Sequence, residues 1–169
     1  MRQLSLLRHA KSSWAEDGQP DRDRPLAPRG RKSGRRLAVH LREQGVRPDL
    51  VLCSPAARTR ETLELIRAEL GDGVDVQVEE ELYGAGAREL LDRLRRLPDA
   101  VEWAMVVGHN PGLQQLVVLL ARDGALRERA RSHYPTGALA TLRLPEGGWS
   151  ELAPGRAELR EYVAPRELV

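Results

Sequence analysis

Short apolar runs alternate with longer amphipathic segments along this chain, and the alternation predicts strands and helices in turn. Leu63, Ile66 and Leu70, for example, recur at helical spacing and form one apolar face. The predicted strands are 3–8, 49–53, 74–78, 103–107, 136–144 and 149–152, and the predicted helices are 31–44, 55–70, 86–97 and 113–121. Strands alternating with helices indicate an α/β fold, a three-layer α/β/α sandwich with a mostly parallel central sheet.

Two predicted helix starts and one long connection interrupt the alternation of strands and helices. Ser54-Pro55 places a capping residue before a proline suited to the first helical position, and Asn110-Pro111 repeats that signature. The polar segment 11–30 is too long for a tight connection, and loops of that length are usually functional or disordered. The tail after Pro154 has no clear pattern.

Two of the predicted strands deliver a histidine at their carboxyl ends. Arg8-His9 ends the first apolar run, and Gly108-His109 ends the run at 103–107. Arg58 follows a third run, 50–53. Because ligands of open α/β sheets bind at the carboxyl ends of the strands, we expect these residues to meet in one crevice. Two imidazoles and two guanidiniums together suit a phosphate group.

Arg58 is favoured by its position in the first turn of a predicted helix. Free N–H groups and the helix dipole favour an anion there, and a guanidinium adds a bidentate clamp. Arg60 should point away from Arg58 on the helix. The alternative for Arg58 is a solvated surface arginine, and the alternative for His9 is a strand-end histidine bonded to backbone. Asn110 is expected to cap the next helix and to contact the ligand.

Composition narrows the class of protein. The 169 residues fit a single domain, 1–169, with 41% hydrophobic and 31% charged residues. A net charge of +2 provides no general field for nucleic acid or an anionic membrane, so we expect neither partner. The single cysteine, Cys53, excludes an internal disulfide. With no signal peptide and no long apolar stretch, a cytoplasmic protein is expected, a monomer by default.

Four linked motifs carry a family resemblance that covers about residues 3–144. The motifs are Leu7-Arg8-His9-Ala10-Lys11-Ser12, Arg24-Pro25-Leu26, Cys53-Ser54-Pro55-Ala56-Ala57-Arg58 and Val107-Gly108-His109-Asn110-Pro111. Together they resemble the histidine phosphatase superfamily, and within it the SixA-type phosphohistidine phosphatase branch. The resemblance implies a phosphoglycerate mutase-like fold and a phosphatase that needs neither metal nor other cofactor. Ala10 replaces the usual glycine, which should be tolerated unless the turn needs a positive φ.

The resemblance also implies roles for individual residues. His9 resembles the nucleophile that takes the phosphoryl group, and Arg8 and Arg58 resemble the clamp on its oxygens. His109 resembles the second imidazole that contacts those oxygens. Lys11 and Ser12 are expected on the substrate-binding rim with Asn110. No metal site is expected, because His9, His109 and Cys53 lack the spacing of a zinc ligand set.

The general acid is the most open of these assignments. Glu81 is chosen by its spacing before a glycine-containing turn, while Glu80, or no acid at all, stays open beside it. The alternative is a solvated acidic run. A phosphohistidine substrate needs the acid least, because a protonated imidazole leaves readily, whereas a sugar or glycerate alkoxide needs a proton.

Three functions therefore compete. The first is a phosphatase that forms a phosphohistidine on His9 and acts on phosphohistidine in a protein. The second is a phosphomonoesterase for a small sugar or glycerate-type phosphate. In phosphoglycerate mutase-like proteins an asparagine commonly follows the tryptophan that corresponds to Trp14. Ala15 occupies that place here, and this departure disfavours mutase-type substrate contacts. The third is a non-catalytic phosphate-binding module.

Overall fold

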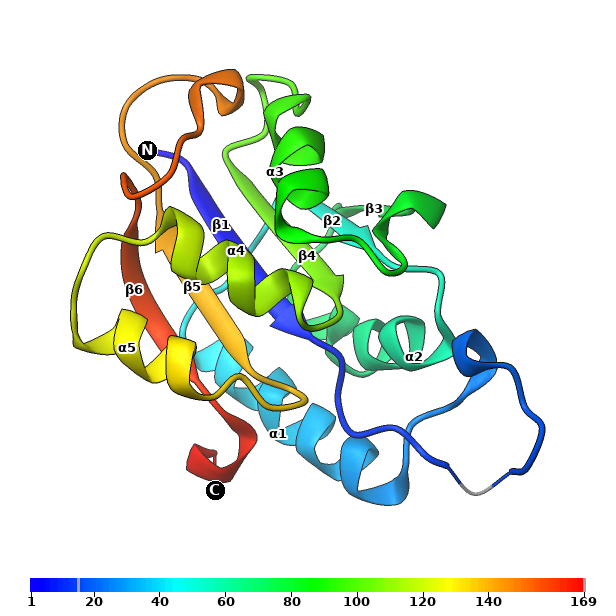
Figure 1. The fold of residues 1–169 in the computed structure, drawn as a ribbon. Helices are drawn as coiled ribbons and strands as arrows, with labels where there is room; N and C mark the ends of the chain where they lie inside the picture. Colours follow the sequence, from blue (N-terminus) through cyan, green and yellow to red (C-terminus); the bar gives the residue numbers. More distant parts are fainter. Residues whose placement is uncertain (15, 169) are drawn as a thin grey trace.

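The computed structural model describes residues 1–14 and 16–168, which form one six-stranded sheet between two layers of helices (Figure 1). Ala15 lies outside the described residues. The strands are β1 (Gln3–Arg8), β2 (Leu50–Cys53), β3 (Asp75–Val78), β4 (Trp103–Gly108), β5 (Leu139–Arg143) and β6 (Glu158–Val163). The helices are α1 (Pro28–Glu43), α2 (Ala57–Ile66), α3 (Ala87–Arg95), α4 (Gly112–Leu120) and α5 (Ala125–Ser132). The 3₁₀ turns are η1 (Asp21–Asp23), η2 (Arg67–Glu69), η3 (Glu80–Leu82), η4 (Trp149–Glu151) and η5 (Pro165–Glu167). The predicted α/β/α sandwich is confirmed.

The sheet is mostly parallel, as predicted, with the strand order β3-β2-β4-β1-β5-β6. Strands β3, β2, β4 and β1 pair in parallel, whereas β5 is antiparallel to both β1 and β6. Arg8 lies opposite Gly108 in the β1–β4 pair, and Cys53 lies opposite Val107 in the β2–β4 pair. The carboxyl ends of β1, β2 and β4 therefore reach the same edge of the sheet.

Each face of the sheet packs against its own set of helices. Leu6 of β1 belongs to the buried cluster on the side of α3, α4 and α5, and its neighbour Leu7 belongs to the cluster on the side of α1 and α2. Figure 1 shows α3 and α4 crossing in front of the sheet. Because successive strand residues point to opposite faces, a run such as Leu6-Leu7 is buried on both sides.

Two predictions for the carboxyl-terminal part of the chain are wrong. Trp149–Glu151 forms the 3₁₀ turn η4 and not a strand, and the partner of β5 is β6 in the tail that had no clear pattern. Trp149 is fully buried, and its indole N–H donates to the Val101 carbonyl, which fixes the turn. The helix α5 was not predicted, because its sequence is mostly polar and only Ala130 is buried.

Helix starts differ from the prediction at two places. Helix α1 begins at Pro28, so the connection after β1 is shorter than predicted, and α2 begins at Ala57, two residues after Pro55. A Cβ on Gly30 would lie 2.1 Å from the Lys11 carbonyl oxygen, so the close approach of α1 to the end of β1 requires glycine. Within the described part of the chain, no helix has the length and apolar character to cross a bilayer.

Candidate active site

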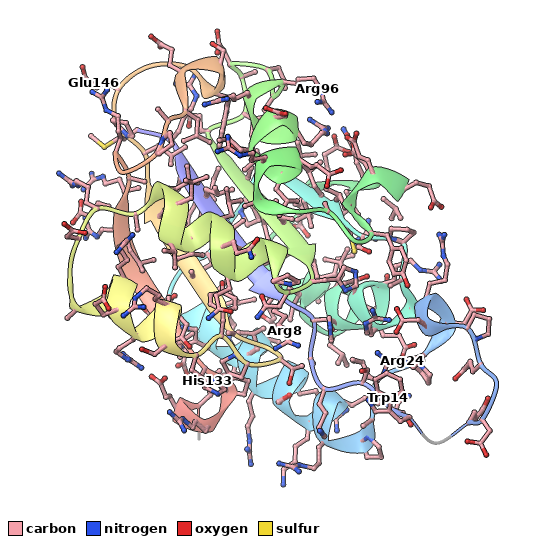
Figure 2. All side chains as sticks on the ribbon, in the orientation of Figure 1. Arg8, Trp14, Arg24, Arg96, His133 and Glu146 are labelled. Carbon is pink, nitrogen blue, oxygen red and sulfur yellow. The ribbon has the colours of Figure 1, made fainter. Side chains whose placement is uncertain are left out.

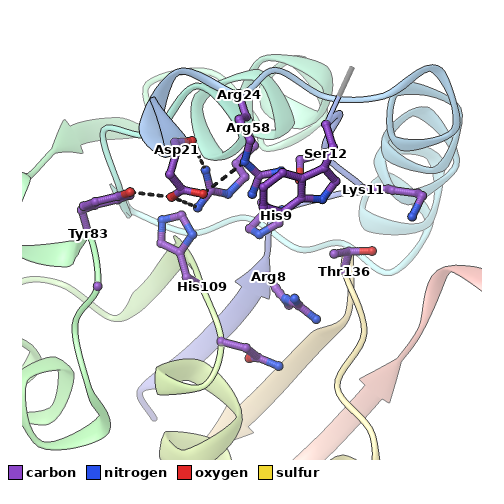
Figure 3. Close-up of a pocket in the computed structure, with 13 residues that line it drawn as sticks. Arg8, His9, Lys11, Ser12, Asp21, Arg24, Arg58, Tyr83, His109 and Thr136 are labelled. Carbon is purple, nitrogen blue, oxygen red and sulfur yellow. Dashed lines mark hydrogen bonds and ion pairs between the residues drawn. The ribbon is translucent and has the colours of Figure 1, made fainter. Parts of the chain in front are cut away.

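A pocket of about 440 Å³ opens at the shared carboxyl edge of β1 and β4 (Figure 3). It combines strand ends, the first turn of α2 and the connection after β1. Its lining consists of Arg8, His9, Lys11, Ser12, Trp14, Asp21, Arg24, Arg58, Tyr83, Gly84, His109, Asn110 and Thr136. The structure thus brings together the predicted pair of histidines, both arginines and all three rim residues.

His9 is held at the end of β1 with one ring nitrogen committed to the backbone. Its Nδ1 lies 2.7 Å from the carbonyl oxygen of Ala10. A carbonyl can only accept, so Nδ1 carries the proton and Nε2 keeps its lone pair. His9 is 6% exposed, and burial, with the nearby His109, Arg58 and Arg8, lowers its pKa to about 3. His9 is therefore neutral at physiological pH.

Ala10, which replaces the glycine usual in the family, fits this turn. No residue other than glycine has a positive φ in the described chain, so Ala10 keeps an ordinary backbone conformation. Its N–H donates to Thr62 Oγ1 at 3.0 Å. The expectation that alanine is tolerated is confirmed.

His109 faces His9 across the pocket, with ring centroids 5.4 Å apart. Its Nε2 is 2.7 Å from Ser54 Oγ, and Nδ1 makes no hydrogen bond to the described residues. The Tyr83 ring meets the His109 ring edge-on, with the ring centroids 5.6 Å apart. Burial and then the charge of Arg58 lower the pKa of His109 to about 4. The prediction that Ser54 caps α2 is wrong, since the cap position is Ala56; Ser54 instead contacts an imidazole.

Arg8 and Asn110 share one backbone acceptor. Arg8 Nη1 and Asn110 Nδ2 donate to the Tyr134 carbonyl at 3.0 and 2.8 Å. Asn110 Oδ1 also accepts the Gln114 N–H in the first turn of α4 at 3.3 Å, although the cap position falls on Pro111, one residue later than predicted. The Asn110 side chain therefore ties α4 to the Tyr134 carbonyl, which also accepts from Arg8.

Arg58 lies in the first turn of α2, as predicted, and its guanidinium is buried against Asp21. Nη1 donates to the Asp21 carbonyl oxygen at 2.8 Å, and Nη2 donates to Asp21 Oδ2 at 3.0 Å. The Nε atoms of Arg58 and Arg8 are both buried without a hydrogen-bond partner among the described residues. Arg8 and Arg58 both line the pocket, and two guanidiniums there fit an anion with several oxygens.

Asp21 was not predicted from the sequence. Its carboxylate accepts from Arg58, from Arg24 Nε at 3.1 Å and from the Tyr83 hydroxyl (Figure 3). The Tyr83 hydrogen bond and then Arg58 lower the pKa of Asp21 to about 2. Asp21 and Tyr83 lie in irregular segments without periodicity, so no sequence signal pointed to them. Arg24 was part of a recognised motif but had no predicted role.

The rim is formed by the residues that follow His9. Ser12 Oγ accepts from Arg24 Nη1 at 2.8 Å, and the Arg24 guanidinium lies 3.4 Å from the centroid of the Trp14 ring. Trp14 is 76% exposed, a large apolar ring at the mouth of a polar pocket. Lys11 is also exposed. Figure 2 places the labelled Trp14 and Arg24 together, well away from the labelled Arg96 at the other end of the molecule.

The structure does not bring the predicted acid Glu81 to this pocket. Glu81 lies outside the pocket lining, where Arg96 Nη2 and Arg93 Nε lie 2.9 and 3.2 Å from its Oε1. Glu80 is also outside the lining and pairs with Arg22 at 2.8 Å. The arginines of α3 draw Glu81 away from the pocket, an attraction that the spacing along the chain does not reveal.

Cys53 does not join the two histidines. Its thiol is buried, donates to the Ser54 carbonyl, and has a pKa raised by burial to about 12. Among the residues that the structure describes, no group of three or more His, Cys, Asp or Glu side chains is arranged to hold a metal ion.

Comparisons with known proteins agree with this geometry. The model of the histidine phosphatase superfamily (branch 1) matches residues 4–140. An uncharacterized protein of Mycobacterium tuberculosis is 38% identical over 164 residues, covering 95% of this chain and 100% of that protein.

Solved structures extend the likeness to three dimensions. A protein from Nakamurella multipartitia, provisionally designated phosphohistidine phosphatase SixA, superposes with a TM-score of 0.83 and 33% identity, covering 97% of this chain and 96% of that one. The protein histidine phosphatase SixA complexed with tungstate gives a TM-score of 0.81 and 25% identity, with 99% of each chain covered.

Proposed function

The chain belongs to the histidine phosphatase superfamily and is of the SixA type, and from this premise we propose that it hydrolyses phosphohistidine in proteins through a covalent intermediate on His9. The observation that carries the proposal is the state of His9. Its Nδ1 donates to Ala10, which leaves the Nε2 lone pair free in a pocket with Arg8, Arg58 and His109. A neutral imidazole with a free nitrogen is a nucleophile that needs no separate base.

The proposed reaction has two displacements at phosphorus. In the first, His9 Nε2 forms a bond to phosphorus while the substrate P–N bond breaks, and its electron pair leaves on the substrate imidazole. In the second, a water oxygen bonds to phosphorus and the electron pair of the His9 P–N bond returns to Nε2, which yields inorganic phosphate. The guanidiniums of Arg8 and Arg58, which line the pocket, stabilise the phosphoryl oxygens in both steps.

His109 complements the two arginines in this mechanism. In the proposed mechanism, the Ser54 hydroxyl donates to His109 Nε2, 2.7 Å away, and the proton of the neutral ring lies on Nδ1. Nδ1–H then donates to a phosphoryl oxygen. The positive charge of the site therefore comes from the guanidiniums, and the imidazoles serve as nucleophile and hydrogen-bond donor. The mechanism assigns no step to a metal ion.

The leaving group is argued from the acids near the pocket. The alkoxide of a sugar or glycerate phosphate needs a proton donor. Glu81 and Glu80 lie outside the lining, and the one carboxyl group within it, Asp21, is held ionised with a pKa of about 2. Phosphohistidine brings its own proton, because its second ring nitrogen titrates near neutral pH, at roughly 6.5 for an unmodified imidazole. This contrast favours phosphohistidine over the phosphomonoester alternative.

The test compares His9→Asn with His133→Ala, a control that removes an exposed histidine outside the pocket lining. Both proteins receive a phosphohistidine protein, phosphoramidate and glycerol phosphate. His9→Asn should lower turnover by about 10³-fold or more and abolish an acid-labile, base-stable ³²P adduct, while His133→Ala keeps both. Unchanged turnover in His9→Asn would overturn the covalent mechanism. Glycerol phosphate as the better substrate of the unmodified enzyme would overturn the leaving-group argument.

A further inference from the structure

The amino-terminal half of α1 presents an uncompensated positive surface. Five of its cations are exposed; Arg31 pairs with Glu61, and the other four, together called the basic face, are Arg29, Lys32, Arg35 and Arg36. The helix has no acidic residue before Glu43, and none of the ion pairs of the described chain includes a member of the basic face. Arginines elsewhere are often paired, such as Arg96 with Glu81 and Arg129 with Glu167. The basic face thus gathers four unpaired positive charges on one helix of this nearly neutral chain.

The amino end of α1, which carries the basic face, lies beside the segment that lines the pocket. The Ala27 N–H, just before α1, donates to the Lys11 carbonyl at 2.9 Å, and Gly30 packs against the same carbonyl. Lys11 itself lines the pocket and is exposed. Figure 1 shows the amino end of α1 beside the segment that follows β1. Lys11 thus lies between the phosphate site and the amino end of α1.

The position of these charges is unfavourable for the helix itself. Cations in the first turn face the positive end of the helix dipole, and the resulting repulsion destabilises the helix. Arg29 and Lys32 lie in that turn or immediately after it. The fold gains no ion pair from them, so their potential remains available to a partner at contact range, within a screening length of about 8 Å.

The size of the surface indicates what kind of partner fits it. From Arg29 to Arg36 the helix rises about 10 Å, at about 1.5 Å per residue. A phosphoryl group in the pocket cannot span that length, whereas a folded protein can contact both places. We propose that the basic face docks an acidic surface of the histidine-phosphorylated protein whose phosphohistidine enters the pocket. This inference rests on the proposed function and names the surface chemistry of its substrate.

The test removes three charges from α1 in Arg29→Gln/Lys32→Gln/Arg36→Gln. The matched control, Arg47→Gln/Arg143→Gln/Arg156→Gln, removes three exposed charges that have no ion pairs and lie outside α1. Arg47 precedes β2, Arg143 pairs with Gln3 of β1 in the sheet, and Arg156 precedes β6. The substrates are a small acidic protein phosphorylated on its one histidine and phosphoramidate itself. The α1 variant should raise KM for the acidic protein about tenfold, since three pairs of about 0.5 kcal/mol give that factor. Both variants should leave phosphoramidate turnover unchanged.

A binding measurement separates this inference from the proposed function. In the His9→Asn background, the phosphorylated acidic protein should bind about tenfold more weakly when the α1 charges are removed, and the difference should vanish at 0.5 M salt. Equal binding by the α1 and control variants would overturn the docking surface even if turnover is normal. Failure of the unmodified enzyme to hydrolyse phosphohistidine would instead reject the proposed function. Charge-dependent binding of RNA or anionic vesicles, without an effect on the acidic protein, would also overturn the inference.

Discussion

Replacing Asp21 by asparagine is expected to make the empty protein less stable and its anion site stronger. Asp21 is the one carboxylate that lines the pocket, and its Oδ2 lies 3.0 Å from Arg58 Nη2. Asparagine has nearly the same shape and keeps one acceptor oxygen for Arg58, Arg24 or Tyr83. The change therefore removes a negative charge beside the phosphate site while leaving most of the packing intact.

The magnitude follows from the 3.0 Å separation. The attraction of two unit charges at that distance is about 1.4 kcal/mol at the dielectric constant of water and about 5.5 kcal/mol at an effective value of 20. The Arg58 side chain is 7% exposed but Asp21 is 49% exposed, which places the pair toward the lower value. We expect Asp21→Asn to lower the free energy of unfolding by about 1–2 kcal/mol without anion. Relief of the repulsion between the carboxylate and a bound oxyanion is of similar size, so phosphate should bind about tenfold more tightly.

The assay is chemical denaturation across a series of inorganic phosphate concentrations. Binding to the folded state adds RT ln(1 + [L]/Kd) to the stability, so one experiment yields both the loss without anion and the affinity. Asp23→Asn is the control, because Asp23 belongs to the same turn, η1, but does not line the pocket. Phosphate affinity that is unchanged or weaker in Asp21→Asn would refute the view that this carboxylate competes with the substrate for Arg58.

Three further predictions concern pH, the excluded acid and the close approach at α1. Between pH 7 and 4.5, the unmodified protein should lose about 2.5 kcal/mol more stability than His9→Asn, because the unfolded histidine protonates near pH 6.5 while folded His9 does so near 3. Urea denaturation at the two pH values measures both losses, and equal losses would contradict this prediction. The stabilising term is fully present above pH 6.5 and fades as the pH falls toward 3. Glu81→Gln should leave phosphoramidate turnover within twofold of the unmodified enzyme. It should change stability by no more than about 0.5 kcal/mol, because the ion pairs of the exposed Glu81 with Arg93 and Arg96 contribute little. A tenfold fall in kcat would restore Glu81 as the acid. Gly30→Ala should lower the free energy of unfolding by about 2–3 kcal/mol, because its Cβ would lie 2.1 Å from a backbone oxygen; stability like that of the unmodified protein would show that α1 can shift.

The sequence by itself determined the parallel sheet and the ends of its strands. Apolar runs buried on both faces leave a local pattern, and a parallel arrangement requires their carboxyl ends to reach one edge. His9 and His109 follow such runs directly, so their meeting could be predicted without coordinates. Arg58 could be predicted for the same reason, because a helix start immediately after a strand places its first turn at that edge.

Only the tertiary structure decided which carboxylate faces the pocket and how each donor is oriented. Asp21 reaches Arg58 from an irregular connection, and Glu81 is drawn outward by arginines of α3 that follow it by more than ten residues. Side-chain direction in such segments depends on partners far along the chain, which leave no periodic trace in the sequence. The proton on His9 Nδ1 also depends on the tertiary structure, because the Ala10 carbonyl accepts it and thereby leaves Nε2 free.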